Sequence, residues 1–232
     1  MQPPSVHKSL WFVCLSIGSM GVVAAFAQQS TPSNAVNGGT IRLRIQAGPP
    51  LFHARNESVQ KELRIDEETR RKLNELYASW GEQYGQIQAE QGKVSGLPEA
   101  ERQAKNNELN KRRGELDFVT TKKFYSLLTE EQIVRFHGTF LQVHGIRALL
   151  RTDVGRWLEI SEKQLKQLGD LETAYRRGTA ELMNVTDSQE NGRRHRELLE
   201  ERERKGLEVL TEEQRKKLAD AKGAPFEFKH NP

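Results

Sequence analysis

A five-residue run, Leu-Thr-Glu-Glu-Gln, occurs at residues 128–132 and again at residues 210–214. Two identical runs this far apart indicate a duplicated unit, which constrains the fold more than any other feature of the chain. In each copy a Gln follows the Thr by three residues, the spacing of a capping box. The Thr hydroxyl then accepts a backbone N–H of the first helical turn, and the Gln side chain reaches back to the N–H of the cap. Both runs predict the start of a helix.

The residues to which we assign this structural role are Leu128, Thr129 and Gln132 in the first copy, and Leu210, Thr211 and Gln214 in the second. Ser161 and Gln164 have the same spacing ahead of another apolar-periodic segment and predict a third helix start. A leucine before the cap and an apolar residue after it form a hydrophobic staple. Ile133 can complete that staple in the first copy, whereas Arg215 occupies the position in the second.

Apolar residues recur at spacings of three and four over residues 66–91, 98–127, 161–182 and 198–210. This period predicts amphipathic helices, and long helices joined by short loops are most simply antiparallel hairpins. The predicted fold is therefore all-α, with two tandem long helical hairpins and short linking helices. We expect the loop of the second hairpin at residues 184–192, and the hub of the fold at residues 129–150, the most apolar part outside the N-terminal segment.

The two predicted units are unequal in length. The offset is 95 residues from Leu63 to Leu158 but only 82 from Leu128 to Leu210. We therefore divide the chain into residues 28–50 as a flexible tail with an extended segment, residues 51–150 as the first helical-hairpin unit, and residues 151–232 as a second, shorter one. Residues 40–46 and 226–229 alternate apolar and charged side chains, which predicts either a small two-strand clasp or two segments lying extended on the helices.

Residues 1–27 have the composition of a secretory signal peptide. A short polar stretch with Lys8 precedes an apolar run, and Ala-Phe-Ala at residues 25–27 fits a cleavage site. We expect cleavage after Ala27, periplasmic or secreted localisation, and no stable membrane insertion after cleavage. The alternative is an uncleaved N-terminal anchor. The single cysteine, Cys14, lies in this segment, so disulfides cannot hold the remaining chain together and an apolar core must do so.

Charge excludes one class of function. The net charge is only +4, and a nucleic-acid-binding protein shows a segregated basic face. Four basic clusters nevertheless occur: residues 111–113, 122–123, 176–177 and 193–196. They predict either a cationic rim that attracts acidic or unfolded partners or an ordinary solvated helix face. We expect a protein partner and no nucleic acid.

We find no residues with the spacing of a catalytic, cofactor-binding or metal site. The chain has no G-x-S-x-G, no phosphate loop and, beyond residue 27, no cysteine nucleophile. No carboxylate stands in an apolar setting that would raise its pKa. His137 and His144 are seven residues apart, about 10.5 Å along a helix, which is too far for direct binding of one ion. We therefore expect no enzyme, no metal and no cofactor.

Paired Leu-Thr-x-x-Gln boxes in an exported helical-hairpin chain resemble the LTXXQ-motif proteins of the bacterial periplasm, the Spy/CpxP-like family. The resemblance covers the two boxes and their helices. It implies a curved helical cradle that is often dimeric, and a role as an ATP-independent chaperone or an envelope-stress adaptor. This chain differs from small members in being a tandem of unequal hairpins, and its oligomeric state stays open. The alternative function is a structural or regulatory envelope protein with one dedicated partner.

Overall fold

The computed structural model describes Ile45 and residues 49–229, all of which fall within one compact unit, Ile41–Pro232. Ten α-helices and one 3₁₀ helix occupy most of these residues, and no strand occurs among them. The all-α prediction is confirmed. The predicted signal peptide and most of the tail predicted over residues 28–50 lie outside the described residues, and helix α1 already begins at Pro49. No helix in the described part of the chain is both long and apolar enough to span a membrane. The division at residue 150 stays a prediction.

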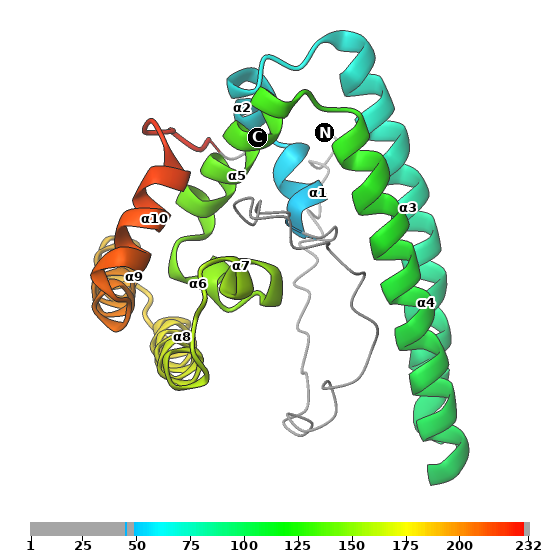
Figure 1. Ribbon diagram of the computed structural model, residues 1–232. Coiled ribbons are helices and arrows are strands. Elements are labelled where there is room, and N and C mark those ends of the chain that lie inside the picture. The colour runs from blue at the N-terminus through cyan, green and yellow to red at the C-terminus, as the bar shows by residue number, and fades with distance from the viewer. Residues whose placement is uncertain (1–44, 46–48, 230–232) are drawn as a thin grey trace, which may run out of the picture. The chain divides into compact units, whose positions relative to one another are not determined.

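The helices follow one another in two similar series (Figure 1). The first series is α1 (Pro49–Ala54), α2 (Glu57–Glu62), α3 (Glu67–Lys93), the 3₁₀ helix η1 (Val94–Gly96), α4 (Glu99–Ser126) and α5 (Glu130–His144). The second is α6 (Ile146–Leu149), α7 (Thr152–Trp157), α8 (Glu162–Leu182), α9 (Ser188–Val209) and α10 (Glu212–Lys222). In each series two short helices, two long helices and a closing helix follow in that order.

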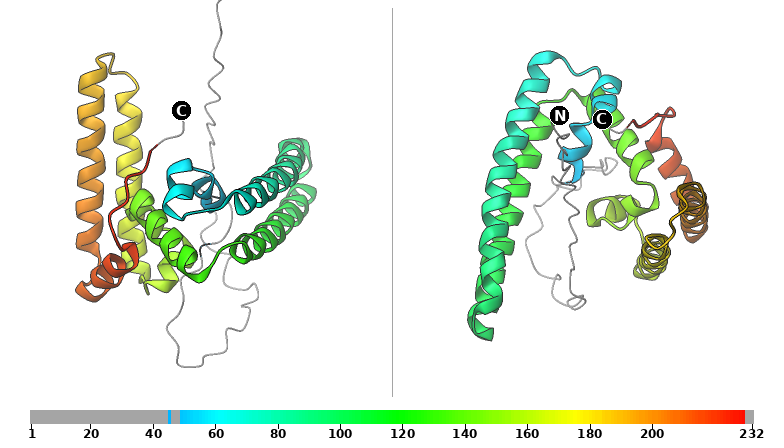
Figure 2. Two further views of the ribbon diagram at one scale, coloured as in Figure 1. Left: turned by 90° about the horizontal axis from the view of Figure 1, so that it is seen from above. Right: turned by 180° about the vertical axis from the view of Figure 1, so that it is seen from behind.

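Helices α3 and α4 lie side by side in all views (Figures 1 and 2). Trp80 of α3 and Thr120 and Phe124 of α4 are buried, whereas most other side chains of the two helices are exposed. The indole N–H of Trp80 donates to Asp117 at 3.0 Å. Trp80 and Phe124 belong to one apolar cluster, and Ile87 and Leu109 to another, so a narrow apolar stripe joins the two helices.

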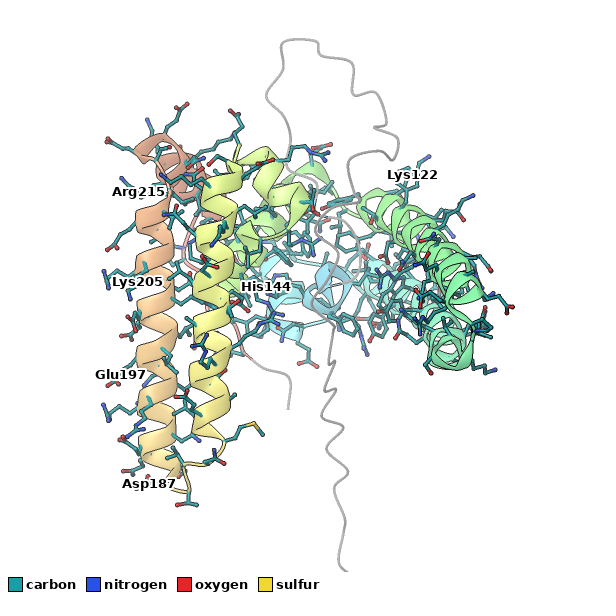
Figure 3. All side chains as sticks on the ribbon, turned by 90° about the horizontal axis from the view of Figure 1, so that it is seen from below. Lys122, His144, Asp187, Glu197, Lys205 and Arg215 are labelled. Carbon is teal, nitrogen blue, oxygen red and sulfur yellow. The ribbon has the colours of Figure 1, made fainter. Side chains whose placement is uncertain are left out.

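Helices α8 and α9 form the second adjacent pair (Figure 2). The loop predicted over residues 184–192 is shorter than expected, because α9 already begins at Ser188. Asp187 lies at the end of the α8–α9 pair where the two helices are connected (Figure 3), and its carboxylate accepts from the N–H groups of Gln189 and Glu190. This N-cap extends the helix through a polar stretch whose composition resembles a loop.

Helix α5 contributes to both large apolar clusters, as expected of the hub. Phe136 belongs to the cluster that includes Trp80 and Phe124, and Phe140 to the cluster that includes Trp157 and Leu168. Both phenylalanines are fully buried. Helix α10 packs against α5 as well. The fold is thus assembled around α5.

The segment predicted to form one strand of a terminal clasp, residues 226–229, has neither helix nor strand structure. It lies against α5 and the start of α2 through side-chain hydrogen bonds. Its expected partner at residues 40–46 falls outside the described residues except for Ile45, so the clasp itself stays a prediction. The main-chain N–H of Ile45 donates to the Tyr125 hydroxyl at 2.8 Å, and its C=O accepts from that hydroxyl at 3.0 Å.

The short helices α2 and α7 end in the same way. Arg64 and Glu159 follow them with positive φ of 51° and 58°. The next N–H bonds back to a carbonyl five residues earlier, Ile65 to Gln60 and Ile160 to Gly155. This Schellman-type end reverses the chain just before α3 and α8. It also directs the carbonyls of residues 63 and 158 toward the helices that close each series.

Candidate protein-binding surface

The candidate motif residues form capping boxes at three helix starts. Before α5, the Gln132 N–H donates to the Thr129 hydroxyl at 3.2 Å, and the Thr129 N–H donates to Gln132 Oε1 at 2.9 Å. The same reciprocal bonds open α8 and α10, at Ser161 with Gln164 and at Thr211 with Gln214. Each box satisfies backbone N–H groups that have no partner inside their helix.

The glutamines of the two repeated runs also bind a distant turn, which the sequence does not reveal. Gln132 Nε2 donates to the carbonyl of Leu63 at 3.0 Å. Gln214 Nε2 donates to the equivalent carbonyl of Leu158 at 3.3 Å and to that of Glu159 at 3.1 Å. The Leu-Thr-Glu-Glu-Gln run therefore connects the start of each closing helix to the turn after α2 or α7. Its hydrogen-bonding groups are used inside the fold.

The leucines of the two runs are both buried, but their surroundings differ. Leu128 and Ile133 pack on the same apolar cluster, as a hydrophobic staple requires. In the second copy Arg215 (Figure 3) donates instead to the carbonyls of Leu207 at 3.2 Å and Leu210 at 2.7 Å. A guanidinium that binds the end of α9 thus occupies the place of the staple.

A groove of about 360 Å³ runs between α3 and α4. Its apolar lining consists of Leu76, Trp80, Ile87, Leu116 and Val119. Glutamines from α3 line one side, and Arg112, Glu115 and Lys123 from α4 line the other. The groove is therefore apolar along its floor, and Lys123 is the cation of its α4 edge that has no ion pair among the described residues.

Two apolar residues of α4 are unusually exposed, and one of them, Val119, lines this groove. Phe118 is 61% exposed and Val119 is 48% exposed. Lys122 and Lys123 follow them one turn later, and neither forms an ion pair within the described part of the chain. Figure 3 shows the position of Lys122 on α4. Apolar and uncompensated cationic side chains therefore lie together on this helix.

The other basic clusters are largely neutralised by neighbouring acids. Arg112 approaches Glu90 to 2.8 Å, and Arg176 approaches Glu172 to 3.0 Å. Arg193 and Arg194 both bind Glu190, at 2.8 and 2.6 Å. Exposed pairs such as these contribute little to stability, but they cancel local charge. Among the four predicted basic clusters, residues 122–123 are the least neutralised by acidic side chains.

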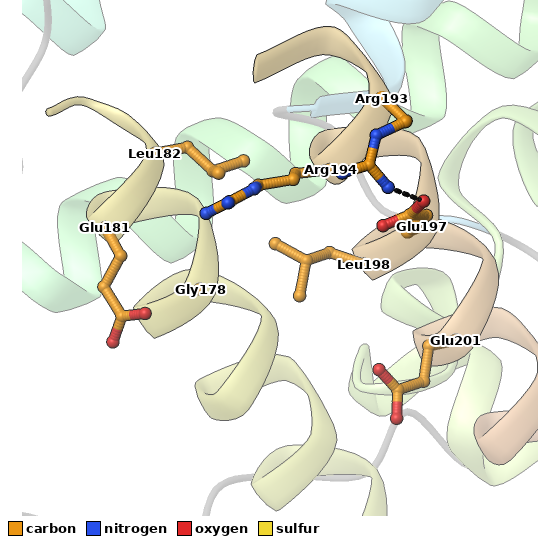
Figure 4. A pocket seen from close by; sticks show the side chains of 8 residues that line it. All are labelled: Gly178, Glu181, Leu182, Arg193, Arg194, Glu197, Leu198 and Glu201. Atoms are coloured by element: carbon orange, nitrogen blue, oxygen red, sulfur yellow. Dashed lines mark hydrogen bonds and ion pairs between the residues drawn. The ribbon is translucent and has the colours of Figure 1, made fainter. Parts of the chain in front are cut away.

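A second groove of about 360 Å³ lies between α8 and α9 (Figure 4). Leu182 and Leu198 line it together with several charged residues, among which Arg193 binds Glu197 at 2.5 Å. Gly178 lies so close to Leu198 that a Cβ there would approach a Leu198 methyl carbon to 2.9 Å. This groove offers less apolar lining than the first and is charge-compensated.

Two histidines are buried near the hub. His53 Nε2 lies 3.0 Å from the Thr139 hydroxyl, and its ring lies 5.6 Å from that of His144. Burial lowers the pKa of His53 to about 3, and His144 adds to the shift. Burial, followed by the charges of Arg147 and Arg151, lowers the pKa of His144 to about 4. Both imidazoles are therefore neutral near pH 7.

His137 is also buried, and its ring nitrogen lies 2.8 Å from the Tyr125 hydroxyl, so it is not a surface residue.

One carboxylate contradicts the expectation that none has a raised pKa. Asp117 is half-buried between α3 and α4, and burial raises its pKa despite the hydrogen bond from Trp80. No pattern in the sequence distinguishes Asp117, because its burial depends on a tryptophan 37 residues earlier.

No group of three His, Cys, Asp or Glu residues in the described ranges could hold a metal ion. Comparisons with protein families, characterised proteins and solved structures found no significant match to this chain.

Proposed function

We propose that this chain is an exported protein-binding module that holds partly unfolded or partner proteins on the α3–α4 groove, without ATP and without catalysis. The observation that carries this proposal is the exposure of Phe118 and Val119 beside Lys122 and Lys123, which have no acidic partner among the described residues. The sequence of residues 1–27 supports export. The paired Leu-Thr-x-x-Gln boxes support the same role through their resemblance to Spy/CpxP-like proteins.

The chemistry of the groove favours apolar, acidic segments as partners. Unfolded chains expose apolar side chains, and these lose contact with water when they cover Trp80, Val119 and the rest of the groove floor. Unpaired lysines at the edge accelerate encounter with acidic segments and make binding sensitive to salt. No specific side-chain pocket is required, so partners of varied sequence can bind.

The direct test is suppression of aggregation. The chain from residue 28 onward should keep a chemically unfolded client in solution when ATP is absent, and better at low salt than at physiological salt. No suppression at several-fold excess in either salt would reject the proposal. If the same chain instead captured one protein in stoichiometric amounts in a crosslinking pull-down, the structural or regulatory role with a dedicated partner would be favoured.

Variants locate the activity. Phe118→Ser with Val119→Ser should reduce suppression at least fivefold, because it removes the most exposed apolar side chains of α4. Val134→Ser is the matched control, since Val134 is 67% exposed but lies on α5 and not on α4. Urea unfolding of both variants checks that stability is kept. Equal activity of the two variants would remove the α3–α4 groove from the proposal.

A further inference from the structure

The segment that follows α10, residues 223–229, lies along the surface made by α5 and the start of α2 (Figure 2). Gly138 of α5 allows the last turn of α10 to come close: a Cβ at that position would lie 2.6 Å from the Lys222 carbonyl oxygen. The chain then leaves α10 at Gly223, whose φ of 64° suits glycine. The segment is thereby directed onto α5.

The side chain of Gln142 pairs with the main chain of this segment. Its Oε1 accepts from the Phe226 N–H at 2.8 Å, and its Nε2 donates to the carbonyls of Ala224 at 2.9 Å and Lys222 at 2.7 Å. Arg135 also donates to the Ala224 carbonyl, at 2.8 Å. A carboxamide that accepts one N–H and donates to nearby C=O groups offers a peptide the same kinds of hydrogen-bonding group as the edge of a β-strand.

A second pair of side chains binds the main chain at Lys229. Asn56 Nδ2 donates to the Lys229 carbonyl at 2.7 Å, and the Lys229 N–H donates to the Ser58 hydroxyl at 3.2 Å. Asn56 is buried, and its Oδ1 caps α2 by accepting from the N–H groups of Ser58 and Val59. The cap fixes the orientation of the amide, so the donor that meets Lys229 is held in place.

Alternate side chains of the segment face the protein. Phe226 and Phe228 are partly buried and pack on the apolar cluster of α1 to α5, whereas Glu227 and Lys229 are exposed. The Phe228 ring stacks on His53, with the centroids 6.0 Å apart and the planes inclined by only 7°. This alternation is that of an extended chain bound along one face.

We propose that Asn56, Ser58, Arg135 and Gln142 form a peptide-binding groove, and that the chain's own residues 223–229 occupy it as an internal ligand. The groove fits an extended polypeptide with aromatic side chains at two alternate positions. Its hydrogen bonds go to main-chain groups that every peptide has, and its selectivity comes from the two aromatic positions. The site is separate from the α3–α4 groove, and the inference does not depend on the function proposed there.

Occupation by a linked segment explains how such a groove is regulated. A covalently attached ligand acts at an effective concentration of about millimolar, so a free peptide competes poorly until the segment is displaced or removed. The apparent affinity for a free peptide then falls in proportion to the fraction of chains with an open groove. The segment at residues 223–229 is therefore an autoinhibitory contact.

The test uses a chain that ends after Gly223 and a fluorescent peptide with the sequence of residues 223–232. We expect saturable binding by fluorescence anisotropy to the shortened chain, and at least tenfold weaker binding to the full chain. A peptide with both phenylalanines replaced by Ala should bind at least tenfold more weakly. A peptide with Glu227→Ala and Lys229→Ala is the matched control and should bind within threefold of the original, because those side chains are exposed.

A second pair of variants retains residues 223–229, in case the shortened chain does not fold. Ser58→Cys with Lys229→Cys, introduced into the chain from residue 28 onward, should form a disulfide that closes the groove, because the Ser58 hydroxyl lies 3.2 Å from the Lys229 N–H. Phe226→Ala with Phe228→Ala should open it. We expect peptide binding to be strongest in the opened variant and lost in the oxidised one, and restored by reduction to the level of the unmodified chain. Equal binding by the opened and oxidised chains, or a helical shortened chain with no binding at millimolar peptide, would overturn the proposal.

Discussion

The helix pairs α3–α4 and α8–α9 follow the same order of elements but differ in what is buried between their helices. Between α3 and α4 the buried contacts are apolar: Trp80 and Phe124 belong to one apolar cluster, and the Trp80 indole bonds to Asp117 at 3.0 Å, whereas the ion pair of Glu90 with Arg112 is partly exposed. Between α8 and α9 the central contact is ionic, with Arg202 and Glu172 buried at 3.0 Å and the guanidinium of Arg202 lying 4.3 Å from the centre of the Tyr175 ring.

This difference determines what each hairpin offers to other molecules. The first pair leaves Phe118 and Val119 exposed next to lysines, whereas the groove of the second is lined by charges that already neutralise one another. The two helix pairs therefore follow the same order of elements, and the first presents an apolar surface.

The largest effect should come from the buried ion pair. Arg202→Met leaves Glu172 buried with only the exposed Arg176 and Arg147 nearby, and removal of one partner of a buried pair costs about 3–5 kcal/mol. Urea unfolding measures the loss. Arg204→Met is the matched control, because Arg204 is 61% exposed in its pair with Glu208 and should change stability by less than about 1 kcal/mol. Similar losses in both variants would remove the distinction between the hairpins.

Acid should weaken the region around the first hairpin through the buried histidines. The pKa of His53 is lowered from 6.5 to about 3 and that of His144 from 6.5 to about 4. The folded chain keeps both rings neutral while the unfolded chain binds protons below pH 6.5. Unfolding free energy should therefore fall as pH decreases from 6.5 toward 4, by a few kcal/mol in all.

The control for this pH dependence is a pair of histidine variants. His53→Gln should make the loss of stability between pH 7 and pH 5 clearly smaller, since the depressed group has been removed. His195→Gln should leave the loss unchanged, because His195 is exposed between α8 and α9. Urea midpoints at the two pH values measure both. A pH dependence unaffected by His53→Gln would show that other groups cause it.

The two repeated glutamines should differ in importance. Gln214 is 9% exposed and binds the carbonyls of Leu158 and Glu159, whereas Gln132 binds only that of Leu63. With each hydrogen bond worth about 0.5–1.5 kcal/mol, Gln214→Ala should cost about 2 kcal/mol and Gln132→Ala about 1 kcal/mol. Thermal or urea unfolding distinguishes them. The reverse order would mean that these long-range bonds are not what stabilises the closing helices.

The smallest effect should come from the cap itself. Thr129→Ala removes an N-cap oxygen and should cost about 1 kcal/mol. Stability should change before any binding does, because Thr129 bonds only within its own helix start. Thr129→Ser, which keeps the hydroxyl, should recover most of the loss. Weaker client binding at an unchanged unfolding midpoint would show that Thr129 has a role beyond structure.

The helix starts could be predicted from the sequence because a capping box is local. Thr129 and Gln132 are three residues apart, and the chemistry of that spacing does not depend on the rest of the chain. The bond from Gln132 to the Leu63 carbonyl could not be predicted, because it depends on the turn at Arg64 with its positive φ. The length of α9 was mispredicted because Asp187, a strong N-cap, precedes residues whose composition resembles a loop.

The candidate surfaces, too, could be predicted from the sequence only where they depend on local spacing. The apolar period of α4 is visible in the sequence, but which of its residues stay exposed depends on the width of the contact with α3. The alternation of residues 226–229 was visible too, whereas the side chain that pairs with them, Gln142, lies 84 residues away from Phe226 in an unremarkable position. Long-range partners of this kind leave no pattern in one sequence.

The proposed function requires that clients bind the α3–α4 pair rather than the α8–α9 pair. A photo-crosslinking amino acid placed at position 118 on α4, or at position 183 at the end of α8, tests it directly, because Phe118 and Met183 are both apolar and highly exposed, at 61% and 82%. With a chemically unfolded client, we predict strong crosslinking from position 118 that declines with salt, and little from position 183. Equal crosslinking from the two positions, or stronger crosslinking from 183, would contradict the account.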